Sequence, residues 1–112
     1  MTPGPLMLIA LIGAHLFLDY AGQGDFMAKA KNATAPIPGV PWWIVLWSHA
    51  AIHGAAAALI TGFWPIFFAE TGCHSAIDDA KCRNLLGFKM DQALHLACKV
   101  GWFAAVWYQH ER

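Results

Sequence analysis

The stretch from Trp42 to about Ile60 contains no Asp, Glu, Lys or Arg residue. As an α-helix it would be about 28 Å long, close to the roughly 30 Å thickness of a bilayer hydrocarbon core. Further apolar stretches run from about Pro5 to Tyr20, from Trp64 to about Lys81 and from about Leu86 to Tyr108. None alternates apolar and polar residues over a sustained length, as β-strands do, so the sequence predicts an all-α fold.

Glycine and proline residues separate these stretches and favour turns between helices. They include Gly22, Gly24, Pro36, Pro38, Pro41, Gly62 and Pro65. Phe26–Asn32 has the pattern of a short amphipathic helix within the first connection. We therefore expect a compact antiparallel bundle of four helices, forming a single helical membrane domain over residues 1–112.

The composition favours a membrane protein. Only 12% of the residues are charged and 58% are hydrophobic, whereas a typical soluble domain is about a quarter charged. A small soluble domain needs polar surface to cover its core, and this chain has few charged residues that could form such a surface. A soluble helical protein remains an alternative, because the first and third stretches are short or polar for membrane spans.

Several function classes find no support in the residues. The net charge is zero, which argues against nucleic-acid binding because that requires a basic surplus. The three cysteines form no CxxC pair, so neither a disulfide framework nor a thiolate zinc site is expected. The sequence also has no G-x-S-x-G element that would present a serine nucleophile.

Each predicted helix carries two metal-capable side chains at positions i and i+4, which lie on one helix face. The pairs are His15 and Asp19, His49 and His53, His74 and Asp78, and Asp91 and His95. They occur late in the first and third helices and early in the second and fourth. In an antiparallel arrangement all of the pairs should therefore meet in the same half of the bundle, as in metal-binding helical bundles.

Mixed imidazole and carboxylate ligands suit zinc, manganese or iron better than calcium, and we expect one or two ions. His49, His53, His74 and Asp78 are the expected core ligands. His15, Asp19, Asp91 and His95 would complete a second metal site or act as acid and base, with catalytic roles for Asp19, Asp91 and His95. Gln23 and Gln92 flank the pairs and could orient a ligand or a water.

Two interpretations without catalysis remain open. The histidines and aspartates could bond directly to one another, which would satisfy buried polar groups and fix the register of the helices. The protein would then act as a membrane module that binds a partner. Chains of His and Asp residues also relay protons, so ion or proton handling is a further alternative.

The order of the motifs resembles a family of small bacterial and phage membrane proteins that form a domain of unknown function. The matching segments are His15-Leu-Phe-Leu-Asp19-Tyr20-Ala-Gly-Gln23, His49-Ala-Ala-Ile-His53, His74-Ser-Ala-Ile-Asp78-Asp-Ala-Lys81 and Asp91-Gln92-Ala-Leu-His95. The resemblance covers most of the chain and implies a multi-pass membrane protein. For a phage-encoded member, the partner-binding alternative would involve phage–host interplay.

The helical His and Asp pattern is also similar to membrane-bound metal-dependent hydrolases and to soluble HD phosphohydrolases, although this chain lacks an adjacent His-Asp dipeptide. This similarity implies hydrolysis of a phosphoester of a lipid or a nucleotide. The basic residues of the connections favour a cytoplasmic location for the polar cluster. These residues are Lys29, Lys31, Lys81, Arg83 and Lys89. The expected environment is thus the bacterial inner membrane, with the lipid bilayer as partner and self-association or a membrane protein partner as open alternatives.

Overall fold

The computed structural model describes residues 2–112, and helices account for all of the regular structure in that range. The elements are α1 (Pro5–Leu16), the π-helical segment η1 (Phe17–Ala21), α2 (Gly24–Ala30), α3 (Trp42–Thr61), α4 (Pro65–Cys82) and α5 (Phe88–Glu111). The all-α prediction is confirmed. Four of the five α-helices are long, and the fifth, α2, corresponds to the short helix expected at Phe26–Asn32.

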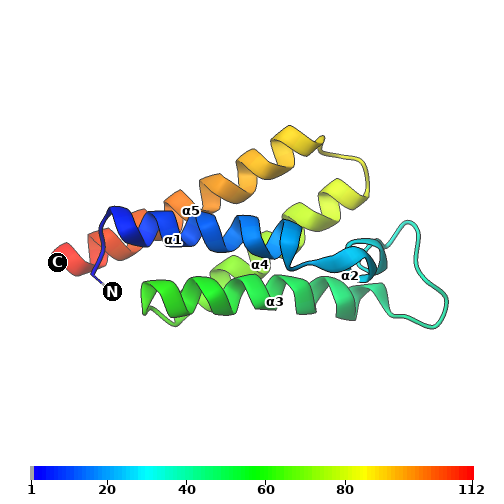
Figure 1. The fold of residues 1–112 in the computed structure, drawn as a ribbon, viewed down its shortest axis with the longest axis horizontal. Coiled ribbons are helices and arrows are strands. Elements are labelled where there is room, and N and C mark those ends of the chain that lie inside the picture. The colour runs from blue at the N-terminus through cyan, green and yellow to red at the C-terminus, as the bar shows by residue number, and fades with distance from the viewer. Residues whose placement is uncertain (1) are drawn as a thin grey trace.

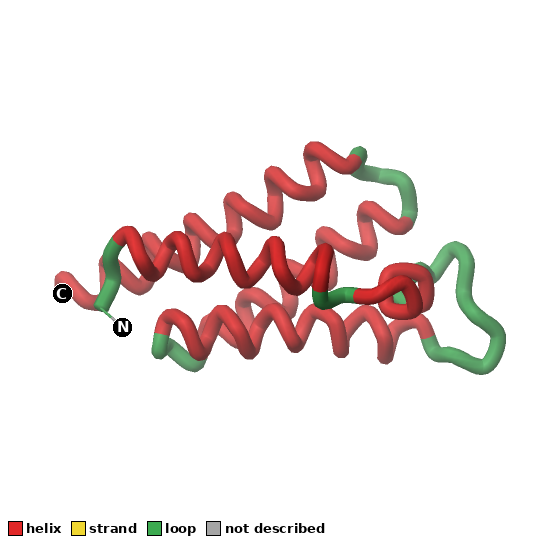
Figure 2. Tube along the Cα trace, viewed as in Figure 1, coloured by secondary structure: helices red, strands yellow, loops and turns green. Residues whose placement is uncertain are grey.

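The four long helices form an elongated molecule measuring 49 × 24 × 22 Å. α1 packs against α3 and α5, and α4 packs against the same two helices. Figure 1 shows that successive long helices run in opposite directions, so that both chain termini lie at one end. The connection between α4 and α5 and the short helix α2 lie toward the other end, as the tube in Figure 2 also shows.

The local sequence explains where the long helices begin and end. Pro65 occupies the first turn of α4, where its missing N–H costs no helical hydrogen bond. α3 ends at Gly62, whose φ of 70° is left-handed and whose N–H donates to the Ala58 carbonyl. The expected ends of these helices agree with the observed ones to within a few residues, which is the usual uncertainty of such boundaries.

The first helix differs from the expected continuous α-helix. It changes to π-helical geometry at Phe17, and the Gly22 N–H donates to the Phe17 carbonyl at 2.7 Å. The chain then bends by 88° before α2 begins. π-helical turns inside helices occur frequently at functional sites, and this one contains Asp19.

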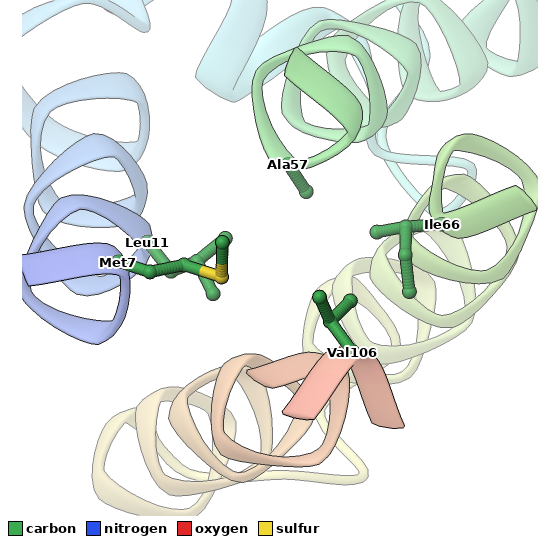
Figure 3. Packing of buried hydrophobic residues seen from close by; sticks show 5 residues of the cluster. All are labelled: Met7, Leu11, Ala57, Ile66 and Val106. Carbon is green, nitrogen blue, oxygen red and sulfur yellow. The ribbon is translucent and has the colours of Figure 1, made fainter. Parts of the chain in front are cut away.

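An apolar core fills the end of the molecule near the chain termini (Figure 3). Its buried members come from all four long helices and are Met7, Leu11, Ala57, Ile66 and Val106. These residues lie early in α1 and α4 and late in α3 and α5. The opposite half of the interior contains the paired His and Asp residues together with a few apolar side chains, such as Val45, Leu46 and Ala50.

The distribution of polar residues is reversed relative to an ordinary soluble domain. Among the described residues, 13 polar or charged residues are buried, against nine hydrophobic ones. Many large apolar side chains are instead on the outside, including Leu59 at 84% exposure and Trp64 at 72%. Polar residues of these types are rarely buried unless they are paired or bound to an ion.

Among the described helices, α3 is long and apolar enough by itself to cross a membrane. The helical stretches Pro5–Ala21 and Gly24–Ala30 meet the same criterion only when they are taken together across the 88° bend. α4 and α5 do not meet it. Their buried charges contribute to this result, since Glu70, Asp78, Asp91 and Lys99 all lie inside the molecule.

Candidate metal centre

All of the predicted i, i+4 pairs come together in the half of the molecule distant from the chain termini. The eight side chains are buried, with none more than 9% exposed. They are His15, Asp19, His49, His53, His74, Asp78, Asp91 and His95. The alternation of late and early positions along antiparallel helices thus places the eight groups in one shared cluster, as the pattern predicts.

The Asp19 carboxylate lies at the centre of one group of imidazoles. Its Oδ1 atom is 2.9 Å from His53 Nε2, 3.2 Å from His49 Nε2 and 3.5 Å from His74 Nε2. Its Oδ2 atom is 3.6 Å from His15 Nε2, one turn earlier in the same helical segment. One carboxylate therefore approaches imidazoles from three different helices.

The Asp78 carboxylate gathers a second group of donors. Its Oδ1 atom lies 3.0 Å from His95 Nε2. Its Oδ2 atom lies 3.3 Å from His74 Nε2, 3.4 Å from His49 Nε2 and 3.0 Å from Lys31 Nζ. His49 and His74 thus lie between the two carboxylates and link the two groups into one cluster.

The start of α5 supplies the remaining contacts. Asp91 Oδ1 is 3.5 Å from His95 Nε2. Gln92 donates from Nε2 to Asp91 Oδ2 at 2.9 Å, and its Oε1 lies 3.1 Å from His15 Nε2. Gln92 Nε2 also lies 3.5 Å from Asp19 Oδ2, so Gln92 contacts three cluster residues, which fits the supporting role expected for it.

Three sets of side chains have donor atoms close enough together to hold a metal ion, with all atoms in a set within 4.8 Å of one another. The sets are Asp19 with His49, His53 and His74; His15 with His74 and His95; and Asp78 with Asp91 and His95. The structure groups Asp19, rather than the expected Asp78, with the three core histidines. Asp78 belongs instead to a set with the residues of α5.

The spacing in the first set is compatible with a bound metal ion. Four ligands arranged tetrahedrally at roughly 2.0–2.1 Å from zinc are separated from each other by about 3.3–3.4 Å. The distances from Asp19 Oδ1 to the three imidazoles, 2.9 to 3.5 Å, span this value. A carboxylate oxygen has only about two lone-pair sites, so it cannot accept hydrogen bonds from all three rings.

Unpartnered atoms within the cluster lead to the same conclusion. Of the three rings around Asp19, only His49 meets hydrogen-bond geometry with it. His53 Nε2 and both ring nitrogens of His74 are buried without a hydrogen-bond partner. Such atoms normally have a partner, and a cation among these ligands would provide one for the nitrogens that face it.

Lys31 is a cluster residue that the sequence pattern missed. The sequence counts Lys31 among the basic residues of the connections that favour a cytoplasmic location, but Lys31 is only 9% exposed. Its Nζ donates to Asp78 Oδ2 at 3.0 Å and to Gln23 Oε1 at 2.6 Å. Gln23 in turn donates from Nε2 to the Asp19 backbone carbonyl at 2.9 Å. Gln23 therefore supports the cluster by holding Lys31 in place beside the Asp19 backbone.

A buried ion pair between Glu70 and Lys99 was also missed. These residues are 0% and 2% exposed. Glu70 lies four residues before His74 and Lys99 four residues after His95, so the i, i+4 pattern extends one further turn along α4 and α5. That continuation was the sequence signal that could have identified them.

A cavity of about 590 Å³ opens beside the cluster. Asp19, Asp78 and Asp91 line it together with Lys31 and Lys81. The cavity therefore provides a space in which a small molecule could reach the carboxylates of all three acidic cluster residues. Its volume lies within the range of about 300–1,000 Å³ that is typical of ligand sites.

Comparisons with known proteins identify the family but no activity. Residues 7–111 match the family model described as a protein of unknown function, DUF3307. A 65-residue segment is 40% identical to part of an alpha-glucuronidase of Hypocrea jecorina. The matched segment covers 56% of this chain but only 7% of that protein. The chain spans so little of that relative that its activity is not carried over. No solved structure matches the chain. Since the family model covers nearly the whole sequence, the chain belongs to the DUF3307 family.

Proposed function

We propose that this protein is a membrane-embedded metal-binding protein that hydrolyses a phosphoester with its His/Asp cluster. The observation that carries the proposal is the set formed by Asp19, His49, His53 and His74, whose donor atoms lie within 4.8 Å of one another and are buried beside a cavity. Buried charges of this kind require a partner or an ion. Asp19 of this set lines the cavity, which favours hydrolysis over a purely structural role because a substrate could approach the metal from that side.

The reversed distribution of residues supports the membrane environment. Large apolar side chains on the outside suit lipid, whereas in water they would form an extensive apolar surface. They occur on every long helix, for example Ile9 on α1, Trp47 on α3, Phe68 on α4 and Trp107 on α5. The buried charges of α4 and α5 lower the average hydropathy of these helices without altering the surface that faces outward.

The proposed location is the bacterial inner membrane with the cluster toward the cytoplasm. Exposed basic residues near this end of the molecule support the orientation under the positive-inside rule. They include Lys29 in α2, Lys81 in the last turn of α4, and Arg83, which follows α4. The buried Lys31 no longer counts toward that argument.

The residues divide between holding an ion and handling a proton. A divalent ion held by the cluster would supply Lewis acidity and a water nucleophile at neutral pH. Asp91 lines the cavity, and its Oδ1 atom has no hydrogen-bond partner while Gln92 holds the other oxygen. Asp91 is therefore suited to take a proton at Oδ1 and to share it with His95 Nε2, which lies 3.5 Å away.

A screen of phosphomonoesters and phosphodiesters with the metal-loaded protein in detergent tests the proposal. Asp91→Asn should lower kcat by about 10²–10⁴-fold, the usual contribution of an acid–base group. It should keep the metal held by Asp19, His49, His53 and His74. If no phosphoester is hydrolysed by protein that carries stoichiometric metal, the hydrolase proposal is wrong and a non-catalytic metal site remains.

The second candidate is a membrane module in which the His and Asp residues bond to one another. The observation in its favour is the direct hydrogen bonding of His49 to Asp19 and of His95 to Asp78. In that case the protein would act by binding a partner, and alanine at these positions would lower thermal stability without removing any metal. Metal content therefore separates the two candidates.

A further inference from the structure

We propose that Lys31 is a substrate-binding residue that holds the anionic oxygens of a phosphate group in the cavity beside the cluster. The inference rests on the proposed function in taking a phosphoester as the substrate. The inference goes beyond the proposed function because it names the side chain that recognises the phosphate. It also predicts that anion binding depends on the state of the cluster.

The position of Lys31 follows from the bend in the first helix. The chain turns by 88° between η1 and α2, and α2 packs against α3. Lys31 is the residue that caps the C-terminus of α2. The bend therefore returns a lysine from outside the four long helices to the inner wall of the cavity, where it contacts Asp78.

The ammonium group of Lys31 has a donor to spare. It donates to Asp78 Oδ2 and to Gln23 Oε1, and a lysine ammonium carries three N–H donors. Lys31 also lines the cavity, so a ligand there could accept from the third donor. A positive group this well buried binds an anion more strongly than an exposed lysine does, because water screens it less.

The charges around the cavity make anion binding conditional on a metal. Asp19, Asp78 and Asp91 line the cavity and would repel a phosphate when no cation is present. Asp78 Oδ2 also accepts a hydrogen bond from the Lys31 ammonium group and balances its positive charge. Once Asp78 shares its charge with a metal, Lys31 lacks a full counter-ion, and the phosphate of a substrate would supply it.

The phosphate could belong to a small molecule in solution or to a lipid headgroup. The cavity, at about 590 Å³, has room for more than a phosphate group alone. Tyr20 and Phe88 add apolar surface to its lining. Both sources present the same oxygens to Lys31, so the experiment needs one arm for each.

The test uses full-length protein in detergent, loaded with zinc and then desalted so that free zinc cannot precipitate phosphate. Wild type, Lys31→Met and Lys29→Met are compared. Lys29 is a matched control, because it pairs with Asp25 at 3.1 Å and its side chain is 71% exposed, away from the cavity. Isothermal titration with inorganic phosphate forms one arm, and phosphatidic acid added to the micelles, against phosphatidylcholine, forms the other.

We expect wild type and Lys29→Met to bind phosphate, phosphatidic acid or both, and Lys31→Met to bind the same ligand at least tenfold more weakly. Lys31→Met should keep its zinc at least as tightly, since Asp78 loses a competing cation. Equal binding by Lys31→Met and wild type, or no binding by zinc-loaded wild type, would overturn the inference and leave the metal site intact. Wild type that takes up no zinc yet binds phosphate through Lys31 would contradict the proposed function and the metal dependence, but not the role of Lys31.

Discussion

Glu70 and Lys99 form a buried ion pair between α4 and α5, one helical turn from the cluster histidines His74 and His95. The pair lies between the His/Asp cluster and the apolar core near the chain termini. It therefore fixes the register of α4 against α5 at the point where the interior changes from polar to apolar. A buried polar residue is known to fix the register of packed helices in coiled coils.

Removing one partner of this pair should destabilise the protein strongly. Lys99→Met leaves the Glu70 carboxylate buried and unpaired, which typically costs about 3–5 kcal/mol. The double variant Glu70→Leu with Lys99→Leu should recover most of that loss, because no uncompensated charge remains. Thermal unfolding in detergent measures both. A Lys99→Met protein as stable as wild type would show that the pair contributes little to the fold.

Gly54 should not tolerate a side chain. A Cβ atom at this position would lie 2.7 Å from the Phe67 carbonyl oxygen and would also clash with the Thr71 hydroxyl, so α3 and α4 would have to separate. We expect Gly54→Ala to destabilise by about 1–3 kcal/mol, as overpacking does. Gly72→Ala is the control, since nothing lies within 4 Å of its added Cβ and alanine favours helix. Equal unfolding temperatures for the two variants would contradict the close approach.

Acidification should release the metal. Imidazole ligands bind metals only when neutral, and an ordinary histidine gains a proton near pH 6.5. Metal occupancy should therefore be complete at pH 7.5 and be lost as the pH falls to about 5, because each ligand imidazole that gains a proton no longer binds the ion. Elemental analysis after dialysis at each pH gives the profile. Metal that stays bound at pH 4 would argue against a site built mainly from histidines.

The exposed aromatic residues should contact lipid. Trp64, which caps the N-terminus of α4, is 72% exposed. Trp107 in α5 is 45% exposed. Lipids brominated on their acyl chains should quench tryptophan fluorescence in reconstituted protein. Replacing Trp64 with Phe should remove part of the quenched signal. Fluorescence unaffected by brominated lipid would place these surfaces outside the hydrocarbon region and count against the membrane proposal.

Much of the cluster could be predicted from the sequence because helical spacing is local information. His74 and Asp78 lie four residues apart, so any α-helix places them on one face, and antiparallel packing then brings the pairs together. Glu70 and Lys99 obey the same spacing but are residue types that are normally exposed. The spacing places them on the same helix faces as the histidines, but their burial as an ion pair depends on each other across two helices.

The role of Lys31 could not be predicted for a different reason. Its position depends on the π-helical turn and the 88° bend that follow Asp19. Neither feature has a strong signature in the residues, because Gly22 and Gly24 allow a bend without fixing its direction. A lysine in a connection is normally at the surface, and only the three-dimensional path of the chain returns this one to the cluster.

The most direct test of the central claim is the metal content of the purified protein. Wild type should be compared with His74→Ala, since His74 belongs to two of the three candidate ligand sets. His110→Ala is the matched control, because His110 is exposed near the end of α5 and distant from the cluster. We predict at least one zinc, manganese or iron per chain in wild type and His110→Ala, and a clear loss in His74→Ala. Wild type without metal after reloading, or equal metal in all three proteins, would contradict the assignment of this cluster as a metal centre.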